Sequence, residues 1–313
     1  MKKAVWLMGI VFSLFLLVLF FQQSSKKSEE AVEQIQAHSI ITTIYPLYYL
    51  SKNIAGSHIE VKRLIKPGNE IHSFAPTPAE MVALDRADLL VTLGKDLEPW
   101  MEKLANATSV EVLSLEKGLS LIHTGEDGDH QDKAHQHSGI DPHVWLDFDN
   151  DIKMIEMIRD KLAILYPQYS MEFLENASLL KKSFEKLKKA YNEGLKQCDR
   201  KRLLVGHDAF GYMEKAYGFE TQSIMGVFAH SRPNATKIAA LSNMIKADTL
   251  HYLFTDPIES SKSAAQLAND MNLTLEPLYT LGNISLGDEQ KGEDMMTLLY
   301  FDLVQFRKGL ECQ

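Results

Sequence analysis

The sequence predicts an α/β protein of two lobes, each with a four-stranded parallel sheet covered by helices, joined by one long rigid helix. Short apolar β-branched runs alternate with helical patterns from Ser39 onward, with four such units before residue 165 and four after residue 200. One amphipathic segment separates the two sets. Strand–helix alternation is typical of parallel sheets covered by their connecting helices. At 313 residues the chain is long enough for two domains.

The expected strands are runs rich in Ile, Val and Leu. The first set is 40–44, 59–65, 89–93 and 110–115, and the second set is 202–206, 219–226, 252–255 and 273–278. The segments between them with helical length and spacing include 78–86, 148–165, 234–247 and 260–271.

The segment 169–197 predicts a single amphipathic helix that begins just after Pro167. Its apolar residues recur at intervals of three and four, with Lys and Glu on the other face: Leu180, Phe184, Leu187, Tyr191 and Leu195. About 30 residues give a rod of roughly 45 Å. A rod midway between two similar halves favours a strut between lobes over a helix within one large domain.

The N-terminus predicts export. Two lysines precede an apolar run of 18 residues, Ala4 to Phe21, which is typical of a signal peptide and also just long enough for an uncleaved membrane anchor. Residues 22–37 are polar and charged and are expected to form a tether. The expected domains are then an N-terminal metal-binding lobe at 38–166, a linking helix at 167–198 and a C-terminal metal-binding lobe at 199–313.

Charge and cysteine content narrow the class of protein. The net charge of −9 disfavours nucleic acid as a partner. No cysteine precedes Cys198, so a lipid anchor is not expected. In an exported chain, Cys198 and Cys312 suggest a disulfide, although two free thiols remain the alternative.

Three histidines follow expected strands: His72 follows the second, His143 the fourth and His207 the fifth. Imidazole is the commonest protein ligand for transition metals, and with few thiols it indicates Zn²⁺ or a neighbouring divalent ion. A single buried histidine is more often a hydrogen-bonded core residue. Ligands bind beyond the carboxyl ends of parallel strands, so these three are expected to meet in a cleft between the lobes.

Acidic residues near the histidines are expected to orient the rings. Asp141, Asp147 and Asp208 are candidate hydrogen-bond acceptors that fix the ring tautomers. The segment 123–137 is rich in histidine and aspartate and has no apolar periodicity. It is either a loop that captures metal weakly or a solvated acidic loop.

Around these residues the chain resembles the zinc- and manganese-binding substrate-binding proteins of bacterial ABC transporters, the ZnuA-like or TroA-like family. The motifs that carry the resemblance occur in the family's order: Glu70–Pro76, the histidine-rich segment, Asp141–Asp147, and His207–Tyr212 with Tyr217-Gly218. The resemblance implies a periplasmic, monomeric capture protein that is not an enzyme. It implies that His72, His143 and His207 bind the metal cargo, which passes to an ABC permease driven by an ATPase.

The resemblance also bears on the metal and on its fourth ligand. Histidine at 207 favours zinc over manganese or iron, because manganese-selective relatives tend to have a carboxylate there. Relatives usually supply an acid shortly after the eighth strand, but here no acid occurs until Asp288 and Glu289. Asp256 and water are the other candidates, and His230 in the sixth unit is one more.

The alternative from another class is a zinc-dependent hydrolase. Zinc held by three histidines with an open position can activate water, and Asp208 or Asp147 would be the base. Against this, the chain has no serine elbow, no paired-acid motif and no helix-borne histidine pair of a metalloprotease. Adhesion to host or matrix surfaces leaves no readable pattern in the sequence.

Overall fold

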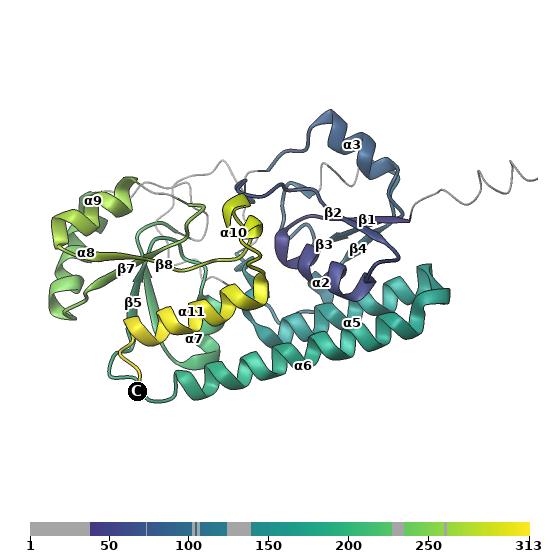
Figure 1. Ribbon diagram of the computed structural model, residues 1–313. Helices are drawn as coiled ribbons and strands as arrows, with labels where there is room; N and C mark the ends of the chain where they lie inside the picture. The colour runs from purple at the N-terminus through teal and green to yellow at the C-terminus, as the bar shows by residue number, and fades with distance from the viewer. Residues whose placement is uncertain are drawn as a thin grey trace, which may run out of the picture. The chain divides into compact units, whose positions relative to one another are not determined.

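Two parallel sheets form the framework that positions the histidines (Figure 1). The computed structural model describes residues 38–72, 74–101, 104, 107–123, 139–226, 235–259 and 262–313, and residues Ser39–Gln313 belong to one unit. The expected signal peptide or anchor, the tether, residues 124–137 of the histidine-rich segment and His230 lie outside the described residues.

Both sheets have four strands, and every strand pair is parallel. The first sheet has the order β2-β1-β3-β4, formed by β1 Ser39–Thr42, β2 Glu60–Arg63, β3 Leu89–Thr92 and β4 Val112–Ser114. The second has the order β6-β5-β7-β8, formed by β5 Arg202–Val205, β6 Glu220–Ser223, β7 Tyr252–Thr255 and β8 Thr274–Pro277. Seven of the eight strands lie within the expected runs, and β1 begins one residue before its run, so the predicted fold class is confirmed.

Helices cover both faces of each sheet. Neighbouring residues of a strand point to opposite faces, and in β1 and β5 such neighbours are apolar and buried. In β1, Ile40 packs into the main core while Ile41 joins a second cluster with Leu84 of a covering helix. In β5, Leu203 packs into the main core and Leu204 joins a separate cluster. The main core is continuous through both lobes.

Four helices lie where the spacing predicts them: α3 Pro78–Asp85, α5 Phe148–Leu165, α8 Ala235–Ala247 and α9 Lys262–Met271. Four more helices were not among the predicted segments: α2 Tyr45–Ala55, α7 Gly211–Tyr217, α10 Leu286–Gln290 and α11 Met295–Gly309. The described residues also include three short 3-10 turns: η1 Glu116–Gly118, η2 Val144–Leu146 and η3 Pro167–Tyr169.

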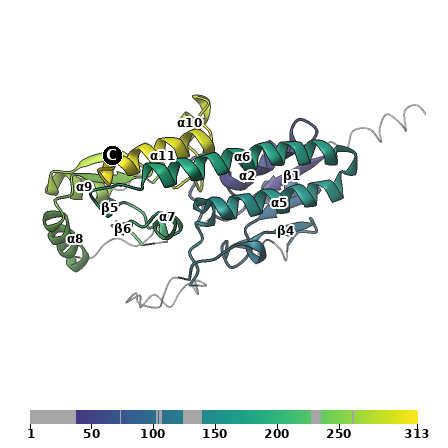
Figure 2. The ribbon, with the colours of Figure 1, turned by 90° about the horizontal axis from the view of Figure 1, so that it is seen from below.

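The long helix α6 spans Ser170–Gly194 and is shorter than the expected segment 169–197. At 25 residues its length is about 37 Å. The helix begins after η3 and ends where Gly194 packs closely against Leu303 of α11. Along its length it packs on α2 and α5 of the first lobe and on α11 of the second (Figure 2). The hydroxyl of Tyr191 donates to the carbonyl of Leu299 at 2.6 Å, which ties α6 to α11.

A second joint connects the lobes through the loop after β8. The Asn283 amide donates from Nδ2 to the carbonyls of Lys66 (2.7 Å) and Asn69 (2.8 Å), in the loop after β2. The amide of Gly68 donates to the carbonyl of Ile284 at 2.9 Å. These bonds hold the loop that carries His72 directly against the second lobe.

The two lobes approach each other closely at a glycine in this joint. A Cβ atom at Gly282 would lie 2.4 Å from Cδ1 of Ile71 and 3.2 Å from Cζ2 of Trp145. The Trp145 indole N–H donates to the carbonyl of Thr280 at 2.8 Å. Side chains of the first lobe therefore pack directly against the backbone of Gly282, in the loop after β8.

Cys198 and Cys312 form a disulfide, which settles the two alternatives left by the sequence. It joins the end of the chain, just after α11, to the segment before β5. The two residues are separated by 114 positions in the sequence.

Within the residues described by the structure, none of the helices is both apolar enough and long enough to span a bilayer.

Asp151 on α5 is a fully buried acid, and neither of its carboxylate oxygens has a hydrogen-bond partner among the described residues. Burial, together with the charge of Asp147, raises the pKa of Asp151 well above its ordinary value. Above about pH 4 the unfolded state loses this proton while the folded state retains it, so this group lowers stability as the pH rises.

We expect Asp151→Asn to raise the free energy of unfolding at pH 8, because the folded state no longer has to keep a buried acid protonated. The gain should shrink as the pH approaches 4. Urea unfolding at pH 5 and pH 8 measures it, with the exposed Asp160→Asn as the control. A destabilised variant, or a gain that is equal at both pH values, would contradict the prediction.

Candidate metal centre

His72 reaches the centre from the loop after β2. Beyond β2, Leu64 and Ile65 continue the pairing with β1 through bonds to the carbonyls of Thr42 and Thr43. The chain then turns, and the backbone N–H of His72 donates to Oε1 of Glu70 at 2.8 Å. The side chain is half-buried, whereas the other two histidines are fully buried.

His143 is the residue that precedes η2, in the loop between the first sheet and α5. Its backbone N–H donates to Oδ1 of Asp141 at 3.0 Å, and its Nδ1 lies 2.8 Å from the same oxygen. Asp141 is itself buried against α7, since a Cβ at Gly211 would lie 2.7 Å from Oδ2. The Tyr212 hydroxyl donates to the carbonyl of Asp141 at 3.0 Å, which links this loop to the second lobe.

His207 lies at the carboxyl edge of the second sheet. Gly206 continues the pairing of β5 with β7 by donating to the carbonyl of Phe254 at 2.7 Å, so His207 follows the last paired residue. Its side chain is only 2% exposed. The imidazole therefore leaves the sheet at the edge where ligands of parallel sheets bind.

The three histidines meet. One ligand nitrogen from each lies within 4.8 Å of the others, and Nε2 of His143 is 3.0 Å from Nε2 of His207. The ring centroids are 5.0 to 5.5 Å apart. Nitrogens bound to one tetrahedral zinc at about 2.1 Å are separated by about 3.4 Å, so this spacing suits a single zinc ion. Within the described part of the chain, the side chains grouped to hold a metal are these three histidines.

The candidate orienting acids have different roles. Asp141 contacts the His143 ring, as described above. Asp147 instead caps α5 by accepting from the backbone N–H groups of Asp149 and Asn150. Asp208 accepts a hydrogen bond from Ser223, and burial raises its pKa.

The candidate fourth ligands from the second lobe hold loops together. Asp256 accepts from the backbone N–H and hydroxyl of Thr280, both at 2.7 Å, and from the N–H of Ile258. Asp288 accepts from the Ser285 side chain at the start of α10. Glu289 forms an ion pair of 2.7 Å with Arg63 of the first lobe. None of these three acids is in the histidine cluster.

Glu259 is a nearby acid that the sequence analysis missed. Its Oε2 lies 3.4 Å from Nδ1 of His207, and its side chain is 16% exposed. Burial, with smaller contributions from the charges of Asp256 and Glu70, raises the pKa of Glu259 to about 8. Its place four residues after β7, at the same sheet edge as His207, is the one sequence signal that could have identified it as a neighbour of the site.

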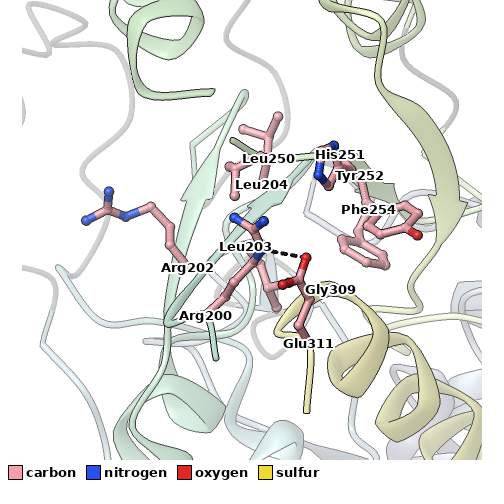
Figure 3. A pocket seen from close by; sticks show the side chains of 10 residues that line it. All are labelled: Arg200, Arg202, Leu203, Leu204, Leu250, His251, Tyr252, Phe254, Gly309 and Glu311. Atoms are coloured by element: carbon pink, nitrogen blue, oxygen red, sulfur yellow. Dashed lines mark ion pairs between the residues drawn. The ribbon is translucent and has the colours of Figure 1, made fainter. Parts of the chain in front are cut away.

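A small pocket lies at the opposite, amino-terminal end of the second sheet (Figure 3). Its lining combines leucines with an ion pair of 2.7 Å between Arg200 and Glu311. His251 also lines it, but this histidine is exposed and is not in the metal-capable cluster. The convergent imidazoles therefore mark the stronger candidate site.

Comparison with known proteins agrees with this fold. The sequence model of the ZnuA family, described as zinc-uptake complex component A, periplasmic, matches residues 40–304. The chain is 30% identical over 326 residues to zinc-binding protein AdcA of Streptococcus pyogenes serotype M3, an alignment that covers 99% of this chain and 61% of AdcA. The chain thus spans about three fifths of the length of this relative.

Other relatives match along nearly their whole length. The high-affinity zinc uptake system protein ZnuA of Bacillus subtilis is 28% identical over 303 residues, which cover 95% of this chain and 93% of the relative. The crystal structure of the Zn(II)-bound ZnuA-like domain of Streptococcus pneumoniae AdcA superposes with a TM-score of 0.74 at 26% identity. That alignment covers 88% of this chain and 99% of the domain. With the family model matching most of the sequence, the chain belongs to the ZnuA family.

Proposed function

We propose that this protein captures a zinc ion outside the cytoplasm and delivers it to an ABC-type importer, with His72, His143 and His207 as the ligands. The observation that carries the proposal is the convergence of three imidazoles within 4.8 Å, two from one lobe and one from the other. Three neutral imidazoles form a donor set that suits Zn²⁺. In this proposal, residues 38–166 and 199–313 are the metal-binding lobes and 167–198 link them.

The compartment and the partners are parts of the same proposal. The Cys198–Cys312 disulfide favours an oxidising environment, and the family model describes a periplasmic component. The apolar run at the N-terminus would export the chain or tether it to the membrane. The partners are an ABC permease and its ATPase, the protein acts as a monomer, and nucleic acid is not a partner.

Capture explains the surroundings of the site better than hydrolysis does. A hydrolase needs a carboxylate free to accept a proton from metal-bound water. The two bases that the sequence suggested, Asp147 and Asp208, are engaged in capping α5 and in a hydrogen bond to Ser223. Glu259 faces Nδ1 of His207, the ring nitrogen turned away from the shared centre. We therefore propose that the protein has no catalytic role.

The two joints between the lobes indicate how capture works. Helix α6 packs on both lobes, and Asn283 ties the His72 loop to the second lobe. A wide hinge motion would break these contacts. Of the three rings, that of His72 is the most exposed, so we propose that the ion enters past His72 and that small loop shifts complete the site.

We expect His143→Ala to weaken zinc binding by at least about 100-fold. A nanomolar site has a binding free energy of about −12 kcal/mol, and few ligands share it. Competition with a chromogenic chelator at pH 7.5 measures the change. His251→Ala, which removes an exposed histidine of the same chain, should bind as the wild type does. Wild-type affinity in His143→Ala would refute the assignment of the ligands.

We expect the site to select zinc over manganese by at least about 100-fold, because imidazole donors favour Zn²⁺ whereas Mn²⁺ suits carboxylate oxygens. Equilibrium dialysis with both ions, followed by elemental analysis of the protein, gives the ratio. Retention of manganese in the presence of equimolar zinc would assign the cargo to manganese, and a matching experiment with Fe²⁺ tests iron.

A further inference from the structure

Glu259 is placed against His207 by a tightly bonded turn. Asp256 accepts from the N–H of Ile258 through Oδ1 (2.8 Å), and its carbonyl accepts from the N–H of Glu259 (3.1 Å). The other carboxylate oxygen of Asp256 accepts from Thr280 in the loop after β8. The turn that presents Glu259 is therefore held from two sides.

The Glu259 carboxylate faces the ring nitrogen of His207 that points away from the other histidines. Oε2 lies 3.4 Å from Nδ1, while Nε2 of the same ring is turned to His143 at 3.0 Å. Oε2 is buried and makes no hydrogen bond to the described residues. A closure of a few tenths of an ångström would bring the pair to the usual hydrogen-bond length of about 2.7–3.2 Å.

The same arrangement occurs at His143. There Nδ1 lies 2.8 Å from Oδ1 of Asp141, and Nε2 points to His207. Both rings thus have a carboxylate at Nδ1 and direct Nε2 toward the shared centre. A histidine that binds metal through one nitrogen carries its proton on the other, where a carboxylate acceptor fixes the tautomer and the ring orientation.

We infer that Glu259 is a positioning residue for His207: it accepts the Nδ1 proton and holds Nε2 toward the cation. The inference rests on the proposed function, because it assumes that these histidines bind zinc. Glu259 acts through His207 and does not itself bind the ion, in agreement with its absence from the metal-capable cluster of the described residues.

The test compares Glu259→Ala with Glu259→Gln, using Glu276→Gln as the matched control. Glu276 lies in the same lobe, has a similarly covered side chain (19% exposed) and pairs with Lys308 away from the histidines. Zinc affinity of the full chain is measured by chelator competition. We expect Glu259→Ala to bind zinc about 10- to 100-fold more weakly. Glu259→Gln, whose amide oxygen still accepts the Nδ1 proton, should stay within about fivefold of the wild type.

A spectroscopic readout separates positioning from a general loss of structure. In ¹⁵N-histidine-labelled, zinc-loaded protein, the Nδ1–H signal of His207 is assigned by its absence from a His207→Gln sample. We expect Glu259→Ala to shift or lose this signal while the corresponding signal of His143, which faces Asp141, stays unchanged. The control variant should leave both signals in place.

Three results would overturn the inference. The first is wild-type affinity with an unchanged His207 signal in Glu259→Ala. The second is a loss in Glu259→Gln as large as that in Glu259→Ala, which would make Glu259 a direct ligand. The third is a change at His143 as large as that at His207, which would indicate general disruption. If the wild-type protein itself takes up no zinc, the proposed function fails; if it binds zinc and only the Glu259 results are negative, this inference alone fails.

Discussion

The contact between the loop after β8 and the loop that carries His72 is the constraint on which the site depends. A parallel sheet presents its functional loops at one edge only, so two sheets build a shared site only if those edges are held at a fixed distance. Asn283 and Gly282 provide this link. The side-chain amide of Asn283 donates hydrogen bonds to two carbonyls of the His72 loop. Gly282 allows Ile71 and Trp145 to pack against its backbone. With that distance set, imidazoles from both lobes come within 4.8 Å of one another.

The rest of the molecule supports this joint. Helix α6 packs on α2 and α5 at one end and on α11 at the other, and the main core runs through both lobes. Tyr212 adds a further link, because its hydroxyl donates to the carbonyl of Asp141 and accepts from the N–H of Ile122. A site braced in this way would bind an ion with little loss of conformational freedom, since the three histidines are already positioned.

Much of the fold was predictable because its signals are local. Buried parallel strands are short apolar runs, and α5 and α6 have clear helical spacing, so the strands and the longest helices were located correctly. Helix α2 was missed because three of its first five residues are Tyr, a residue with weak helix preference that is common in strands. The extent of α6 was overestimated, because the close packing of Gly194 on α11 is a tertiary effect without a trace in the periodicity.

The same distinction applies to the site, where the histidines could be predicted from the sequence and the roles of the acids could not. The placement of three histidines after strands, and a topological rule, were enough to expect that they meet. The roles of the acids were not predictable, because they depend on bonds between distant loops. Asp256 was a candidate ligand, but its carboxylate bonds Thr280. Glu259 follows β7 as Asp256 does, and its position in the sequence does not show that it is the one facing His207. The disulfide was left open because the sequence cannot show that the end of α11 returns to the start of β5.

The most direct test of the account is a crystal structure of the zinc-loaded protein with anomalous data collected at the zinc edge. We expect one strong peak at about 2.1 Å from Nε2 of His143, from Nε2 of His207 and from a ring nitrogen of His72. A peak elsewhere in the protein, or one that lacks any of the three histidines, would contradict it.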